Sequence, residues 1–202
     1  MRMFAGPNGS GKSTLKTLLP LELLGVYLNP DEIEDEIRER GFLDTGAKCI
    51  TTTADEVLAF FKNSSFLQSV GLSSAVSGLR FADGRLLFQG LEVNSYFASV
   101  AADFLRQKLL QKNASFTFET VMSSPDKVAL LEKAQGLGYR TYLYQHLPRA
   151  QPGPTGWPLC ARRQDHQSLL ALAEFTCGRS SAYQPRLRLR QLWASARRDL
   201  AR

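Results

Sequence analysis

Apolar residues in the first 144 positions fall into short continuous runs separated by longer amphipathic segments. The runs predict strands at Met1–Ala5, Gly25–Leu28, Ser115–Phe118 and Tyr139–Tyr144. The segments between them predict helices at Lys12–Leu19, at Glu32–Arg40, at Ser95–Gln111, and from the Ser124-Pro125-Asp126 cap to about Gln135. Strands that alternate with helices in this way are typical of an α/β domain whose parallel sheet is covered by helices on both faces.

Turn and cap signals mark the ends of these helices. Pro20 ends the first helix, and Asn29-Pro30-Asp31 is a turn with N-capping potential before the second. Gly41 is the expected stop of the second helix, which turns Ile33 and Ile37 inward.

The pattern over residues 51–91 is less regular. Thr52 or Thr53 can cap a helix with apolar residues at Val57, Leu58, Phe60 and Phe61. The segment Phe81–Phe88 predicts two short strands around an Asp83-Gly84 hairpin turn.

Both the periodicity and the composition change after Tyr144. Residues 145–167 show neither helical nor strand periodicity. Residues 168–175 predict a short helix, and Leu187–Arg202 predicts an Arg-rich helix. Residues 1–144 carry 15 Lys and Arg against 16 Asp and Glu, whereas residues 145–202 carry 10 against 3. All 10 of these are arginine, and this segment holds five of the nine prolines. We therefore expect a domain over residues 1–144 and a poorly ordered or non-native Arg/Pro-rich tail over residues 145–202.

The sequence also carries information about the cellular location of the protein. There is no apolar run of about 18 residues, so no membrane span is expected. The first motif follows the N-terminus so closely that a signal peptide is not expected. Three cysteines, Cys49, Cys160 and Cys177, lack metal-like spacing and fit reduced thiols. These features predict a cytoplasmic protein.

One motif near the N-terminus carries specific chemistry. Residues 6–13, GPNGSGKS, match the P-loop pattern G-x-x-x-x-G-K-[ST] between a predicted strand and a predicted helix. Glycines let the backbone amides converge on a phosphate, the lysine reaches the β- and γ-phosphates, and the Ser13 hydroxyl is a Mg²⁺ ligand. The predicted ATP site comprises Gly6, Pro7, Asn8, Gly9, Ser10, Gly11, Lys12, Ser13 and Thr14.

The P-loop by itself does not distinguish an ATPase, a GTPase and a kinase. The sequence has no N-K-x-D triplet for guanine, no L-S-G-G-Q signature and no apolar run ending in Asp-Glu. Two acids, Asp31 and Glu119, follow predicted strands and so fall where open α/β sheets bind their ligands. Each has a structural alternative, because Asp31 can cap the following helix and Glu119 can be a solvated charge at a strand end.

Five segments stand out in order over residues 1–144: FAGPNGSGKSTL, YLNPDEIE, ADEVLAFF, VNSYFASVAADFLR and FTFETVMSSPDKVALLEKAQ. Together, and in this order, they resemble the zeta-toxin family of P-loop kinases, most closely the branch described as predicted ABC-type ATPases. The resemblance implies a kinase that transfers the ATP γ-phosphate to UDP-N-acetylglucosamine and whose ATP site is blocked by an antitoxin helix. It implies that Lys12 and Ser13 hold the phosphates and Mg²⁺, that Asp31 is the catalytic base, and that Glu119 and Thr120 contact the sugar.

The tail departs from that family. Members continue after Tyr144 with a lid helix whose arginines contact the γ-phosphate and with a last strand, and neither is recognisable here. We therefore expect the C-terminal strand to be missing and activity to be impaired. The loss of lysine, the gain of arginine and proline and the loss of periodicity at one point indicate a shifted reading frame. A one-base shift permits PELNLAR and RAYVFDNSG, two missing family segments, in family order.

Two alternatives to a kinase stay open from the sequence. A nucleic-acid-binding ATPase would use the Arg-rich tail as a phosphate-binding arm. Against it, the arginines are not grouped with aromatic residues and residues 1–144 are near neutral. The second alternative to a kinase is a regulatory module that binds a nucleotide without catalytic turnover.

Overall fold

The structure is a computed structural model that describes residues 1–121, 126–146 and 170–175. The chain divides into two units, the first formed by Met1–Leu19 with the chain from Thr120 onward and the second by Pro20–Glu119.

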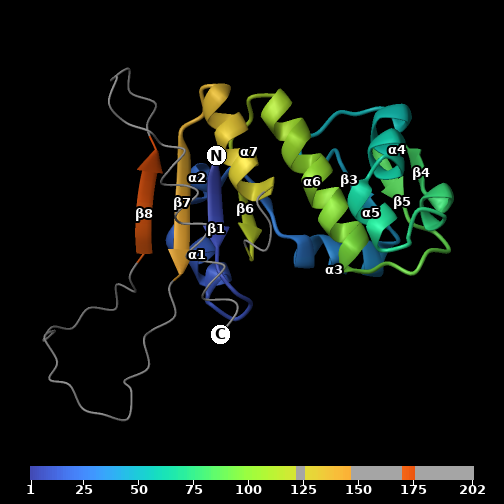
Figure 1. The fold of residues 1–202 in the computed structure, drawn as a ribbon, viewed down its shortest axis with the longest axis horizontal. Helices are drawn as coiled ribbons and strands as arrows, with labels where there is room; N and C mark the ends of the chain where they lie inside the picture. Colours follow the sequence, from blue (N-terminus) through green and yellow to red (C-terminus); the bar gives the residue numbers. More distant parts are fainter. Residues whose placement is uncertain (122–125, 147–169, 176–202) are drawn as a thin grey trace, which may run out of the picture. The chain divides into compact units, whose positions relative to one another are not determined.

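The first unit is built on strand β1 (Arg2–Ala5), which pairs in parallel with β7 (Thr141–His146). Strand β8 (Leu170–Phe175) adds to the other side of β7 in the antiparallel direction, as Figure 1 shows. Helices α1 (Lys12–Leu18) and α7 (Asp126–Gly136) complete the described part of this unit. The core of this unit includes apolar side chains from these strands and helices: Met3, Phe4, Ala5, Leu15, Val128, Leu130, Leu131, Ala134 and Leu143.

Strand β8 corrects two predictions. Residues 168–175 were expected to form a helix, and no strand was expected after Tyr144, yet β8 pairs with β7 from Thr141↔Phe175 to His146↔Leu170. Leucine, alanine and glutamate favour a helix only weakly, by tenths of a kcal/mol per residue. Hydrogen bonding to the edge of a neighbouring strand outweighs that preference here. The remaining tail expectations, including the Arg-rich helix, concern residues outside the described ranges.

The second unit contains another parallel pair, β2 (Val26–Leu28) with β6 (Phe116–Thr120), in the register Val26↔Phe116 to Leu28↔Phe118. Short helix α2 (Leu21–Leu24) precedes β2. Helix α3 (Pro30–Arg40) buries Ile33 and Ile37 as predicted and packs against α6 (Ser95–Gln111). Strand β6 is buried along its whole length.

A small antiparallel sheet also lies in the second unit, with strand order β3-β5-β4. Its strands are β3 (Phe42–Asp44), β4 (Arg80–Ala82) and β5 (Arg85–Leu87). The predicted Asp83-Gly84 turn joins β4 and β5, and both turn residues have positive φ, 49° and 74°. The helical segments between β3 and β4 are α4 (Ala54–Lys62), α5 (Ser65–Ser69) and the 3₁₀ turn η1 (Ala75–Gly78).

Each unit thus contains a parallel strand pair, β1 with β7 in the first and β2 with β6 in the second, and β8 is antiparallel to β7. The predicted α/β class with a parallel sheet is therefore confirmed, and this architecture is compatible with a P-loop fold. In the part of the chain that the structure describes, no helix has the length and apolarity needed to cross a membrane.

Candidate functional site

The predicted P-loop connects β1 to α1. The Gly6 N–H donates to the Thr120 carbonyl at 3.1 Å, and the Ser10 N–H donates back to the Pro7 carbonyl at 3.2 Å. Gly9 and Gly11 have φ of 75° and 82°, a left-handed conformation that costs other residues energy. Both glycines are therefore required by the path of the backbone as well as by the motif.

The Lys12 side chain folds over its own loop. Its Nζ donates to the Gly6 carbonyl at 3.0 Å and to the Pro7 carbonyl at 2.9 Å, and the residue is buried. These two acceptors hold a positive charge against the loop. Ser13 and Thr14 are exposed in the first turn of α1. The loop thus presents one buried ammonium and accessible hydroxyl groups.

A second group of polar residues lies at the ends of β2 and β6. The Glu119 side chain is buried, with 6% of its surface exposed, and the Tyr27 hydroxyl donates to its Oε1. The Asn29 Nδ2 donates to the Glu119 Oε2 at 3.5 Å. The parallel pairing of β2 with β6 brings these three residues together. The alternative that Glu119 is a solvated charge is therefore wrong.

The Tyr27 hydroxyl is held in its protonated state. Burial raises its pKa well above the ordinary value, and the hydrogen bond to Glu119 and the charges of Glu119 and Glu32 raise it further. A protonated phenol donates its hydrogen, so Glu119 is the acceptor in this pair.

Asp31 lies in the first turn of helix α3. Asn29 is the N-cap of α3, because its Oδ1 accepts the Asp31 N–H at 3.0 Å, and Pro30 occupies the first helical position. The alternative in which Asp31 caps the helix is therefore wrong. Its side chain is exposed in the first turn, where a negative charge is favoured by the helix dipole.

The structure thus brings Glu119 together with Tyr27 and Asn29, and brings the Thr120 backbone together with Gly6. Thr120 itself is buried. The contacts of Tyr27 and Asn29 with Glu119 were not predicted from the sequence. The available signal was the alternation in β2, which turns Tyr27 to the face opposite its neighbours Val26 and Leu28.

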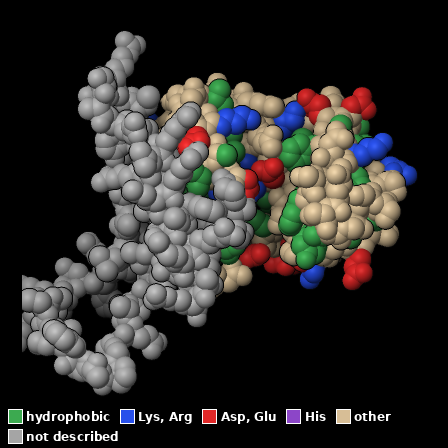
Figure 2. All heavy atoms as spheres, in the orientation of Figure 1, with side chains coloured by type: hydrophobic (Ala, Val, Ile, Leu, Met, Phe, Trp, Pro, Cys, Tyr) green, Lys and Arg blue, Asp and Glu red, His purple; other side chains and the backbone are tan. Residues whose placement is uncertain are grey.

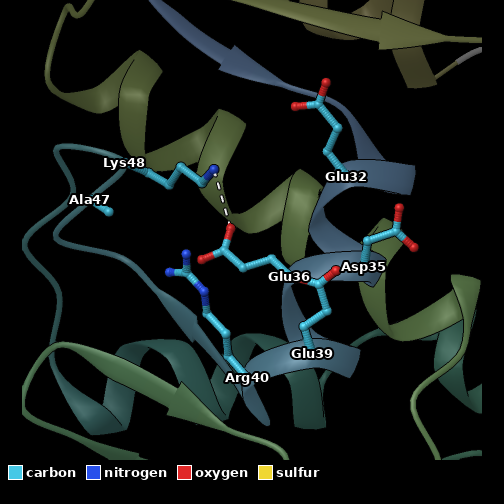
Figure 3. Close-up of a pocket in the computed structure, with 7 residues that line it drawn as sticks. All are labelled: Glu32, Asp35, Glu36, Glu39, Arg40, Ala47 and Lys48. Carbon is cyan, nitrogen blue, oxygen red and sulfur yellow. Dashed lines mark ion pairs between the residues drawn. The ribbon is translucent and has the colours of Figure 1, made fainter.

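An open hollow of about 410 Å³ lies beside α3 and is shown in Figure 3. Its charged lining consists of Glu32, Asp35, Glu36, Glu39, Arg40 and Lys48. Lys48 pairs with Glu36 at 3.3 Å, which leaves the lining mostly acidic. Because like charges repel, this hollow does not suit the phosphates of a nucleotide.

Basic and acidic side chains are interspersed on the face of the described part that Figure 2 shows. A surface that binds nucleic acid through its phosphates carries clustered lysine and arginine. This face has no such cluster among the described residues, and the Arg-rich tail lies largely outside them.

Comparisons of the chain with protein-family models, curated proteins and solved structures found no match.

Proposed function

We propose that this chain binds Mg²⁺·ATP at residues 6–14 and transfers the γ-phosphate to a hydroxyl group of a small molecule. By the sequence resemblance, the first acceptor to consider is UDP-N-acetylglucosamine. The observation that carries the proposal is the P-loop itself, a G-x-x-x-x-G-K-S sequence with left-handed glycines at 9 and 11 and its lysine folded over the loop.

The residues of the loop fit a magnesium-bound triphosphate. Ser10 Oγ is buried without a hydrogen-bond partner among the described residues, which leaves a donor for a phosphate oxygen. The space beside Gly9 is open, since a Cβ built there meets no atom within 4 Å. Ser13, exposed in the first turn of α1, is the residue that would hold Mg²⁺.

Each protein group then has a definite part in the transfer. Bound Mg²⁺·ATP supplies the phosphoryl group and neutralises part of its charge. When ATP binds, the Lys12 ammonium gives up its hydrogen bonds to the Gly6 and Pro7 carbonyls and donates to phosphate oxygens instead. Asp31 accepts the proton of the acceptor hydroxyl while that oxygen bonds to the γ-phosphorus and the bond to the leaving ADP breaks. Glu119 and Thr120 bind the acceptor.

The test is incubation of the purified chain with γ-³²P-ATP, Mg²⁺ and UDP-N-acetylglucosamine, followed by separation of the products. Labelled nucleotide sugar supports the proposal. Calorimetry on the same sample measures ATP binding. ATP binding without transfer to any sugar nucleotide tested favours the regulatory module, and absence of ATP binding contradicts both.

A further inference from the structure

Glu119 is held by two donors that come from one short stretch of the chain. Tyr27 donates to one carboxylate oxygen and Asn29 to the other, so neither oxygen is left without a partner. A carboxylate buried without hydrogen-bond partners is strongly destabilising or takes up a proton. Two donors compensate for that burial and fix the plane of the carboxylate.

The contacts leave acceptor capacity on the same group. An ionised carboxylate has about four lone-pair sites, and the two described donors use one on each oxygen. The remaining sites suit hydroxyl groups, since both described donors to Glu119 are neutral. A fixed carboxylate binds hydroxyls more tightly than a mobile one, because less freedom is lost on binding.

Asn29 has a second contact that fixes its own orientation. Its Oδ1 accepts the Asp31 N–H at 3.0 Å while its Nδ2 points to Glu119. One amide therefore connects the N-terminus of α3, which carries Asp31, to the carboxylate on β6. A shift of either element would break one of the two contacts.

We propose that Tyr27 and Asn29 are positioning residues that hold Glu119 as an oriented hydrogen-bond acceptor for hydroxyl groups of the phosphoryl acceptor. The proposal rests on the proposed function for the identity of that acceptor. Tyr27 and Asn29 act through Glu119 and take no part in the bond changes.

The test compares Tyr27→Phe with wild type and with Tyr96→Phe. Tyr27→Phe keeps the ring and removes the hydroxyl. Tyr96 is a control in the same unit, exposed and in edge contact with Phe66. Binding of UDP-N-acetylglucosamine and of UDP is measured by calorimetry. We expect Tyr27→Phe to weaken the sugar nucleotide about tenfold and to leave UDP and ATP unchanged.

A second variant pair separates positioning from capping. Asn29→Ser keeps an N-cap oxygen but removes the amide donor, whereas Asn29→Asp keeps the cap and brings a second negative charge to Glu119. We expect both to weaken the sugar nucleotide, Asn29→Asp more strongly, with little change in melting temperature for Asn29→Ser.

The hydrogen bond between Tyr27 and Glu119 can be measured without any phosphoryl acceptor present. A hydroxyl proton bound to a carboxylate should give a downfield NMR signal in wild type that Tyr27→Phe lacks and Tyr96→Phe keeps. Absence of that signal, or equal sugar-nucleotide binding by wild type and Tyr27→Phe, overturns the proposal. Failure of the proposed function is read separately, as absence of labelled phosphate transfer by wild type.

Discussion

At the scale of single residues, the described contacts distinguish Lys12 from Lys16, the other lysine of α1. Lys12 is buried with its Nζ on two loop carbonyls, whereas Lys16 lies half-buried in the last helical turn. The carbonyls of Gly6 and Pro7 are neutral acceptors, so a phosphate competes well for the ammonium.

Lys12→Ala should weaken ATP binding about tenfold or more, because a charged hydrogen bond to phosphate is lost. Lys16→Ala removes the same charge nearby and should have a much smaller effect. Calorimetry on both variants, with circular dichroism to confirm the fold, measures the difference. Equal ATP affinity in wild type and Lys12→Ala would contradict the assignment of the loop.

Asp31→Asn removes the proposed base without disturbing the helix cap, which Asn29 provides. We expect loss of most phosphoryl transfer and a melting temperature close to that of wild type, since a first-turn charge contributes only about 0.3–1 kcal/mol. Asp35→Asn, a variant of another exposed acid on α3, is the control. Wild-type transfer rates with asparagine at 31 would exclude the base role.

At the scale of elements, α4 shows how one side chain sets the pH response of a helix. Thr53 and Glu56 form a capping box, and Lys108 of α6 pairs with Glu56 at 2.8 Å. Hydrogen bonds from Lys108, Thr52 and the Thr53 backbone lower the Glu56 pKa to about 2. The depressed pKa means that the ionised side chain stabilises the fold.

This stabilisation is fully present above the ordinary pKa of Glu56, 4.5, and is lost as the pH falls towards about 2. Glu56→Gln should therefore lower the melting temperature at pH 7 and have a smaller effect at pH 2.5. Thermal unfolding followed by circular dichroism at the two pH values measures this. A difference in melting temperature between wild type and Glu56→Gln that does not shrink as the pH falls would contradict this prediction.

The sequence predicted the elements whose signals are local. Asn94 caps α6, whose apolar residues recur at helical spacing, and the Asp83-Gly84 turn lies where expected. Strand β3 was not predicted, because three residues are too few to show alternation and its pairing with β5 is remote in sequence. Strand β8 was predicted as a helix because its leucines and alanines suit one.

The candidate site was predictable in the same uneven way. The residues of the predicted P-loop are consecutive, so a local motif was enough to predict them. The contacts of Glu119 with Tyr27 and Asn29 join positions 92 and 90 residues apart and depend on the pairing of β2 with β6. Such contacts follow from strand register, which this sequence does not reveal.

At the scale of the whole molecule, the change of composition after Tyr144 calls for an explanation at the level of the gene. Strand β7 continues to His146 and β8 pairs with it, so β7 has a partner on this edge. This pairing corrects the expectation that the sheet lacks a C-terminal strand.

The shifted-frame hypothesis remains a prediction. Sequencing the gene around the Tyr144 codon should reveal an overlapping open frame in which a one-base change restores a lid arginine segment and a closing strand. The corrected protein should then transfer phosphate faster than the present one, since arginines that contact the γ-phosphate contribute about 10³-fold or more to the rate. A gene without such a frame would show that the tail is a genuine segment.

The order in which the units occur along the chain has a consequence for folding. The first unit is interrupted, because Pro20–Glu119 lies between its two parts. Strand β1 can therefore pair with β7 only after the intervening residues have been synthesised, since Arg2 pairs with Tyr142. Long loops close slowly, and a chain leaving the ribosome folds first what is already complete. The predicted P-loop, which follows β1, is thus expected to form last. Pulsed hydrogen exchange during refolding should protect the amides of α3 and α6 before those of β1, and the reverse order would contradict this.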